Sequence, residues 1–127
     1  MGRAFLICLA GAAGTGARYG AALVSVRLLG AAFPWGTLFV NVFRSFLLAA
    51  LAVLGGSSGV LSPTARLILG TGFCGGFTTY STFNQETLTY LQEGAIRLAA
   101  LNIVVTLGSC LLAAVAGWSL ASWAVGR

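Results

Sequence analysis

The chain has 127 residues, of which 58% are apolar and only 7% are charged. The charged residues are seven arginines and two glutamates, without histidine, and they give a net charge of +5. Soluble domains have about 25% charged residues, so this composition excludes an ordinary soluble domain and predicts a protein that lies in a lipid bilayer. It leaves almost no groups for acid–base or metal catalysis, and we expect no enzyme. The positive charge gives no argument for nucleic-acid binding.

Four apolar stretches are long enough to cross a bilayer, which takes about 20 residues. They cover residues 4–26, 35–54, 65–90 and 96–125, with short connections between them. Pro34 and Pro63 come just before the second and third stretches, where proline suits the start of a helix. We therefore expect an all-α membrane protein, with residues 1–127 forming a single domain of four transmembrane helices.

The arginines show no clear bias between the two sides of the membrane. The orientation of a membrane protein normally follows an excess of lysine and arginine in its cytoplasmic loops. Here the side of the membrane that holds both termini carries three arginines, and the opposite side carries two or three. Two possibilities stay open: a weak bias that still decides the orientation, or insertion in both orientations. Because four thin helices hardly enclose an aqueous path alone, we expect an oligomer. The two sets are Arg3, Arg66 and Arg127 against Arg27, Arg97 and Arg18.

The first span combines small residues with a charge. Ala12, Gly16 and Gly20 recur at every fourth position, a ladder that predicts close packing against another helix. Arg18 lies in the last turns of this span, where its side chain either reaches the interface or pairs with backbone carbonyls.

Two polar residues lie deep in the second span, three positions apart and therefore on roughly the same face. Asn41 needs polar partners or a wet cavity at that depth. Placing the Arg44 side chain at the bilayer centre costs more free energy, about 2.5–3.5 kcal/mol on insertion scales. It must therefore find water, an anion or a carboxylate. Glu86 is the only deep acid. In the fourth span, Asn102 and Thr106 form a polar stripe, which either joins helices or lines a path.

The third span contains "GFCGGFTTYSTF", residues 72–83. Its glycines allow the backbone to bend or to be approached closely, and its hydroxyls can satisfy the amides and carbonyls of an unwound turn. We therefore expect this helix to be broken at its centre, which exposes carbonyls that suit a small cation. The aromatic residues share one face and either pack together or turn their positive ring edges toward an anion. They are Phe73, Phe77, Tyr80 and Phe83.

The motifs "GARY", "GTLFVN" and "TGFCGGFTTYSTF", followed by Glu86, resemble those of the Fluc (CrcB) fluoride channels. The resemblance implies an antiparallel, dual-topology homodimer that spans the inner (plasma) membrane several times and exports fluoride passively through two pores. It implies a structural Na⁺ held by the backbone carbonyls of Gly75 and Thr78, and no organic cofactor. The partners would be fluoride, the lipid bilayer and a second copy. The implied pore residues are Asn41, Tyr80, Phe83, Ser81, Thr82, Asn102 and Thr106.

Two residues depart from the family pattern. Tyr80 stands where the family usually has phenylalanine, and Arg44 where it usually has a small residue. For Arg44 three hypotheses stay open: it attracts anions toward Asn41, it closes the pore vestibule, or it pairs with Glu86.

Two other function classes are weighed against a channel. A small four-span, dual-topology drug/proton antiporter needs a carboxylate in its first span, and this first span has none. A non-transporting membrane scaffold has no need of a broken, hydroxyl-rich third span. The sequence favours the channel over both.

Overall fold

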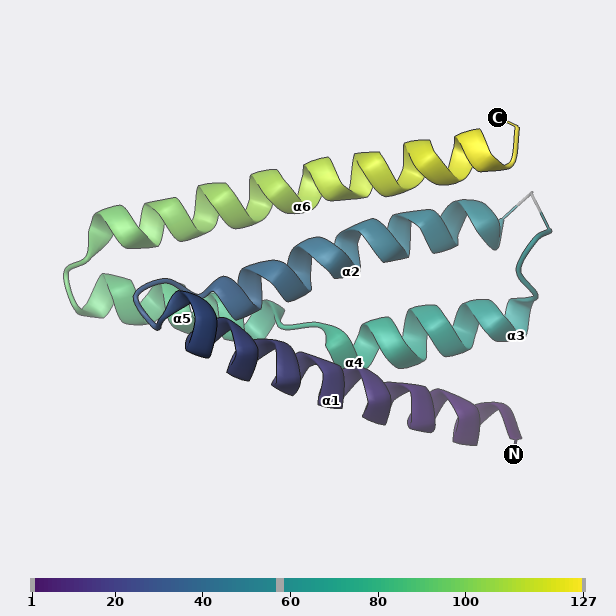
Figure 1. Ribbon diagram of the computed structural model, residues 1–127, viewed down its shortest axis with the longest axis horizontal. Coiled ribbons are helices and arrows are strands. Elements are labelled where there is room, and N and C mark those ends of the chain that lie inside the picture. The colour runs from purple at the N-terminus through teal and green to yellow at the C-terminus, as the bar shows by residue number, and fades with distance from the viewer. Residues whose placement is uncertain (1, 57–58, 127) are drawn as a thin grey trace.

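The computed structural model describes residues 2–56 and 59–126, and throughout these ranges the ordered elements are helices (Figure 1). The all-α class predicted from the sequence is confirmed. The start of α1 and the end of α6 lie at the same end of the bundle (Figure 1). The helices are α1 (Gly2–Leu29), α2 (Trp35–Leu54), α3 (Pro63–Arg66), the π-helix η1 (Leu67–Cys74), α4 (Gly75–Phe77), α5 (Tyr80–Gln92) and α6 (Ile96–Ala124).

Two of the described helices, α2 and α6, are long and apolar enough to cross a membrane. The helix α1 has the length, with 28 residues, but its arginines and glycines make it less apolar. The third predicted span is divided into shorter helices, α3 to α5. Membrane crossing by α1 and by this third segment therefore stays a prediction. Arg127, one of the arginines counted on the side of the termini, lies outside the described residues.

The helix ends follow local signals in the sequence. The Ser62 side chain accepts a hydrogen bond from the Ala65 backbone N–H at 3.1 Å, and Pro63 follows it at the first helical position. Both features favour a helix start. At the other end of the bundle, Gly30 and Gly94 have φ angles of 79° and 72°, which glycine adopts easily where a helix ends. Short turns after α1 and α5 result.

The helices approach each other through glycines. α6 packs along α2, and α1 packs along η1 and α4. A Cβ on Gly14 of α1 would overlap the Phe73 carbonyl oxygen, and a Cβ on Gly76 would overlap that of Gly11. The predicted ladder in α1 is wrong for packing within the chain, because Gly16 and Gly20 have open space beside them. The helix is rotated so that Gly11 and Gly14 face the third segment instead.

Replacing Gly117 of α6 by alanine is expected to lower the free energy of unfolding by about 1–3 kcal/mol, the usual cost of overpacking. A Cβ at this position would overlap the Phe46 carbonyl oxygen of α2, and backbone cannot rotate away as a side chain can. Gly108→Ala, on the same helix, is the matched control, since no described heavy atom lies within 4 Å of a Cβ there. Unfolding in detergent measures both variants; equal losses would contradict the packing described here.

Candidate functional site

The third segment is broken at Thr78 and Thr79, between α4 and α5. Thr78 is extended, with φ −70° and ψ 150°, and Thr79 has φ −143° and ψ 36°. Figure 1 shows the chain running without helical turns between the two helices. The predicted break therefore exists, but it follows the glycines rather than falling on them. Gly75 and Gly76 remain helical.

Two arginines bind backbone carbonyls just before the break, one at the end of η1 and one in α4. The Arg44 Nε donates to the Cys74 carbonyl oxygen at 3.1 Å, and the Arg18 Nε donates to that of Gly76 at 3.4 Å. The Thr15 hydroxyl donates to the same Gly76 oxygen at 3.4 Å. The last four carbonyls of a helix lack partners within the helix and carry partial negative charge. This helix end therefore stabilises both arginines at depth, and Arg18 pairs with a carbonyl, one of its two predicted alternatives.

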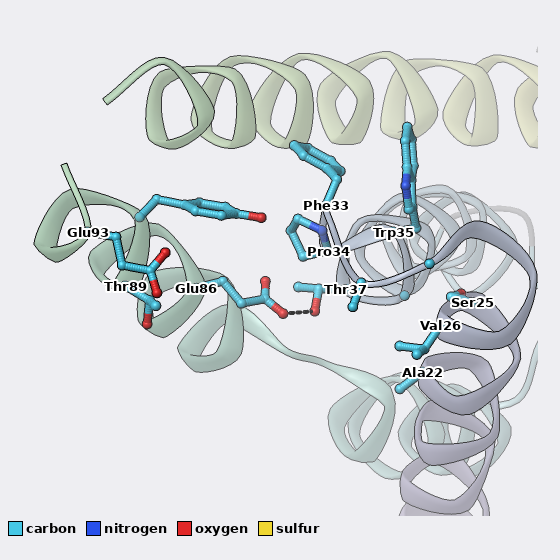
Figure 2. Close-up of a pocket in the computed structure, with 14 residues that line it drawn as sticks. Ala22, Ser25, Val26, Phe33, Pro34, Trp35, Thr37, Glu86, Thr89 and Glu93 are labelled. Atoms are coloured by element: carbon cyan, nitrogen blue, oxygen red, sulfur yellow. Dashed lines mark hydrogen bonds between the residues drawn. The ribbon is translucent and has the colours of Figure 1, made fainter. Parts of the chain in front are cut away.

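The hypothesis that Arg44 pairs with Glu86 is wrong within the described residues. Glu86 Oε1 accepts a hydrogen bond from the Thr37 hydroxyl at 2.6 Å, as Figure 2 shows. Both side chains line a cavity of about 410 Å³ between α1, α2 and α5, together with Glu93 and Tyr90. Arg44 instead reaches from α2 to the carbonyl of Cys74, the last residue of η1. The two charges thus belong to separate cavities.

Asn41 lines a second cavity, of about 170 Å³, between α2, α5 and α6. Its Oδ1 accepts a hydrogen bond from the Thr79 hydroxyl at 3.0 Å, so its amide N–H groups remain to donate into the cavity. Five residues predicted as pore or vestibule groups meet here: Asn41, Arg44, Tyr80, Phe83 and Thr106. The full lining is Asn41, Arg44, Ser45, Thr78, Tyr80, Phe83, Thr106, Leu107 and Cys110.

The four aromatic residues of the motif at residues 72–83 divide into two pairs at the break. Phe73 and Phe77 stack with their ring centroids 5.6 Å apart, and Phe43 meets Phe77 edge-on at 5.9 Å. This pair is packing, one of the two readings of the sequence. Tyr80 and Phe83 lie 5.9 Å apart, tilted by 37°, at the cavity. The break separates the pairs because it redirects α5.

Other predicted pore residues lie away from this cavity in the single chain. Ser81 and Thr82 are exposed on α5. Asn102 is 1% exposed; its amide donates to the Thr87 hydroxyl at 2.9 Å, and its Oδ1 accepts from Thr106 at 3.3 Å. Asn102 therefore joins α6 to α5, while Thr106 reaches the cavity.

Two lining residues, Ser45 and Leu107, were not predicted from the sequence. Ser45 follows the predicted pore residue Asn41 by four positions. Residues four apart share a helix face, so this spacing was the signal that could have found it. Cys110, which continues the polar stripe of Asn102 and Thr106 on the fourth span, also lines the cavity.

A third cavity, of about 650 Å³, lies toward the opposite end of the bundle, between α2, α3 and η1. Arg44 and Arg66 are among its lining residues, which include no carboxylate. Arg44 also lines the Asn41 cavity, so this residue lies between the two. A positively charged cavity thus adjoins a smaller one that holds an amide, hydroxyls and ring edges.

The Gly75 and Thr78 carbonyls were expected to hold a Na⁺. Gly75 is exposed with open space beside it, so its backbone is accessible. However, the carbonyls on either side of Gly75, those of Cys74 and Gly76, already accept hydrogen bonds from arginines. Arg44 also shares a cavity with Thr78. A further cation at this point would meet the like charge of these arginines, so the residues present do not fit a bound Na⁺.

Comparison with known proteins places this architecture in a family. Residues 5–118 match the family described as CrcB-like protein, Camphor Resistance (CrcB). The "Fluoride-specific ion channel FluC" of Sorangium cellulosum (strain So ce56) is 50% identical over 95% of each chain. The protein of that name from Anaeromyxobacter sp. (strain K) is 45% identical over 99% of this chain and 100% of the relative. The one from Shewanella sp. (strain ANA-3) is 40% identical over 94% of this chain and 96% of the relative. The chain belongs to the CrcB family of membrane proteins.

Proposed function

We propose that the protein is a fluoride channel of the inner membrane, through which toxic fluoride leaves the cell passively. The observation that carries the proposal is the pair of adjoining cavities: one positively charged at Arg44 and Arg66, the other small and lined by Asn41, Phe83 and Thr106. Positive charge concentrates anions at the mouth of a path. The relatives named as fluoride-specific channels support the choice of anion.

The small cavity has the chemistry that fluoride requires. Fluoride is compact and strongly hydrated, so a pore must replace its water with donors and still release it. The Asn41 amide is held by Thr79 and offers N–H donors, and the Phe83 ring offers a positive edge. Neither the amide nor the ring carries a full charge, and the positive charge of Arg44 lies at the boundary with the larger cavity. Larger halides are expected to be excluded by width.

A second, antiparallel copy completes the proposed path. The cavity is bounded by Tyr80, which is 66% exposed in the single chain, and the next residues, Ser81 and Thr82, are also exposed. Hydroxyls and a phenol facing lipid would be costly, and a second copy against α5 would cover them. The balanced arginines agree with insertion in both orientations. The dimer would contain two such pores.

Efflux from liposomes that contain the purified protein tests this function. We expect fast release of fluoride with chloride retained, and no dependence on a pH gradient. Release that requires a proton gradient would favour an antiporter. Absence of release from folded dimers would contradict the channel, unless Arg44→Gly restored it, which would identify Arg44 as an obstruction.

A further inference from the structure

Arg44 holds a fixed positive charge at the break of the third segment. Its Nε donates to the carbonyl of Cys74, a residue that is 0% exposed. Cys74 is one of the last four residues before the helix ends at Phe77, where the backbone becomes extended. The guanidinium group is thus bound close to the negative end of a helix.

A positive charge beside the break can stabilise the backbone carbonyls there. The broken helix leaves carbonyls at membrane depth, and each buried group without a partner destabilises the fold. Arg18 and Thr15 bind the Gly76 carbonyl from one side, and Arg44 binds the Cys74 carbonyl from the other. Between these two lies Gly75, whose exposed backbone faces away from the rest of the chain. In the antiparallel dimer proposed above, each copy would contribute one such helix end with its partial negative charge.

We infer that Arg44 supplies the cation of this break from within the chain, so that the protein folds and dimerises without a bound Na⁺. The inference rests on the proposed function only for the presence of a dimer. Arginine suits the task because its planar guanidinium group is always charged and donates from several N–H groups to carbonyl oxygens. Because Arg44 lines two cavities, its other N–H groups can donate to water or to an anion there.

Na⁺ dependence of stability tests the inference separately from fluoride transport. The purified full-length protein and Arg44→Gly are compared in detergent, in sodium chloride and in N-methyl-D-glucamine chloride of equal concentration. The readouts are Tm, the dimer fraction by size-exclusion chromatography and equilibrium binding of ²²Na⁺. Arg97→Gln is the matched control, because it removes an exposed arginine at the start of α6.

For the unchanged protein and for Arg97→Gln, we expect the same Tm in both salts and no saturable ²²Na⁺ binding. Arg44→Gly is expected to lose dimer in N-methyl-D-glucamine and to regain it in sodium, with a Tm increase of about 5 °C and saturable ²²Na⁺ binding. Saturable Na⁺ binding by the unchanged protein, together with dissociation when Na⁺ is removed, would overturn the inference. Arg44→Gly dimers indifferent to Na⁺ would overturn it equally.

If Arg44→Gly does not fold in either salt, Arg44→Lys and Arg44→Gln decide the question. Arg44→Lys keeps the positive charge, so its Tm and dimer fraction must be the same with and without Na⁺. Arg44→Gln removes the charge, so its dimer must depend on Na⁺. Identical behaviour of the two variants would reject a role for the charge. A failure of fluoride efflux would contradict the proposed function and leave these stability measurements unaffected.

Discussion

Asn41→Asp is expected to reduce fluoride efflux by at least about 100-fold with the fold intact. Aspartate has the shape of asparagine and keeps the oxygen that accepts from Thr79 at 3.0 Å, but it replaces the N–H donors with negative charge. Two like charges 4 Å apart repel by about 4 kcal/mol at an effective dielectric constant of 20. An energy of this size corresponds to a nearly 1,000-fold loss of occupancy, so the expected loss of flux is conservative.

Gln92→Glu is the control for this change. It makes the same exchange of amide for carboxylate on an exposed residue at the end of α5, away from the Asn41 cavity. Fluoride electrode traces from liposomes measure both variants, and size-exclusion profiles report folding. Efflux from Asn41→Asp at the rate of the unchanged protein would exclude Asn41 from the path.

Phe83→Leu is expected to reduce fluoride efflux by up to about tenfold. Phe83 is 6% exposed and lines the cavity beside Tyr80. Leucine keeps much of the apolar volume but has no positive ring edge, and interactions specific to aromatic rings are worth about 0.5–1.5 kcal/mol. The upper value corresponds to about tenfold in rate.

Tyr80→Phe provides the comparison, because it keeps the ring edge and removes only the hydroxyl. We expect its efflux to stay within about twofold of the unchanged protein, since the exposed hydroxyl leaves one solvent contact at most. If Phe83→Leu conducts as well as Tyr80→Phe, the ring edges have no part in conduction, and the amide and hydroxyl groups alone line the path.

The contacts of Arg44 reduce the number of roles that this residue can have at the site. A central arginine in a membrane helix is costly, and the sequence suggested anion attraction, obstruction or a pair with Glu86. Its bond to the Cys74 carbonyl and the bond of Glu86 to Thr37 remove the third hypothesis. Anion attraction and obstruction both concern the path of the anion. Fluoride efflux of the unchanged protein and of Arg44→Gly separates them, because loss of an attracting charge lowers efflux and loss of an obstruction raises it.

The sequence by itself determined the class of the molecule and the ends of several helices. Apolar stretches predicted α2 at residues 35–54, as observed, and the start of α6 at residue 96. Pro63 marked the start of α3, where the structure also shows a cap by Ser62. These properties depend on neighbouring residues along the chain, so composition and local spacing suffice to predict them. The motifs of the third segment also pointed to the family later matched over residues 5–118.

Only the tertiary structure decided which residues meet. The glycines at 72–76 predicted the break, yet Gly76 serves close contact with Gly11, and the chain unwinds at Thr78 instead. Gly14, rather than Gly16, packs in α1, and Asn102 binds Thr87. Such contacts depend on how each helix is rotated about its axis relative to its neighbours. A rotation of one residue, about 100°, exchanges a packed face for an exposed one, and hydrophobic patterning is too uniform here to set it.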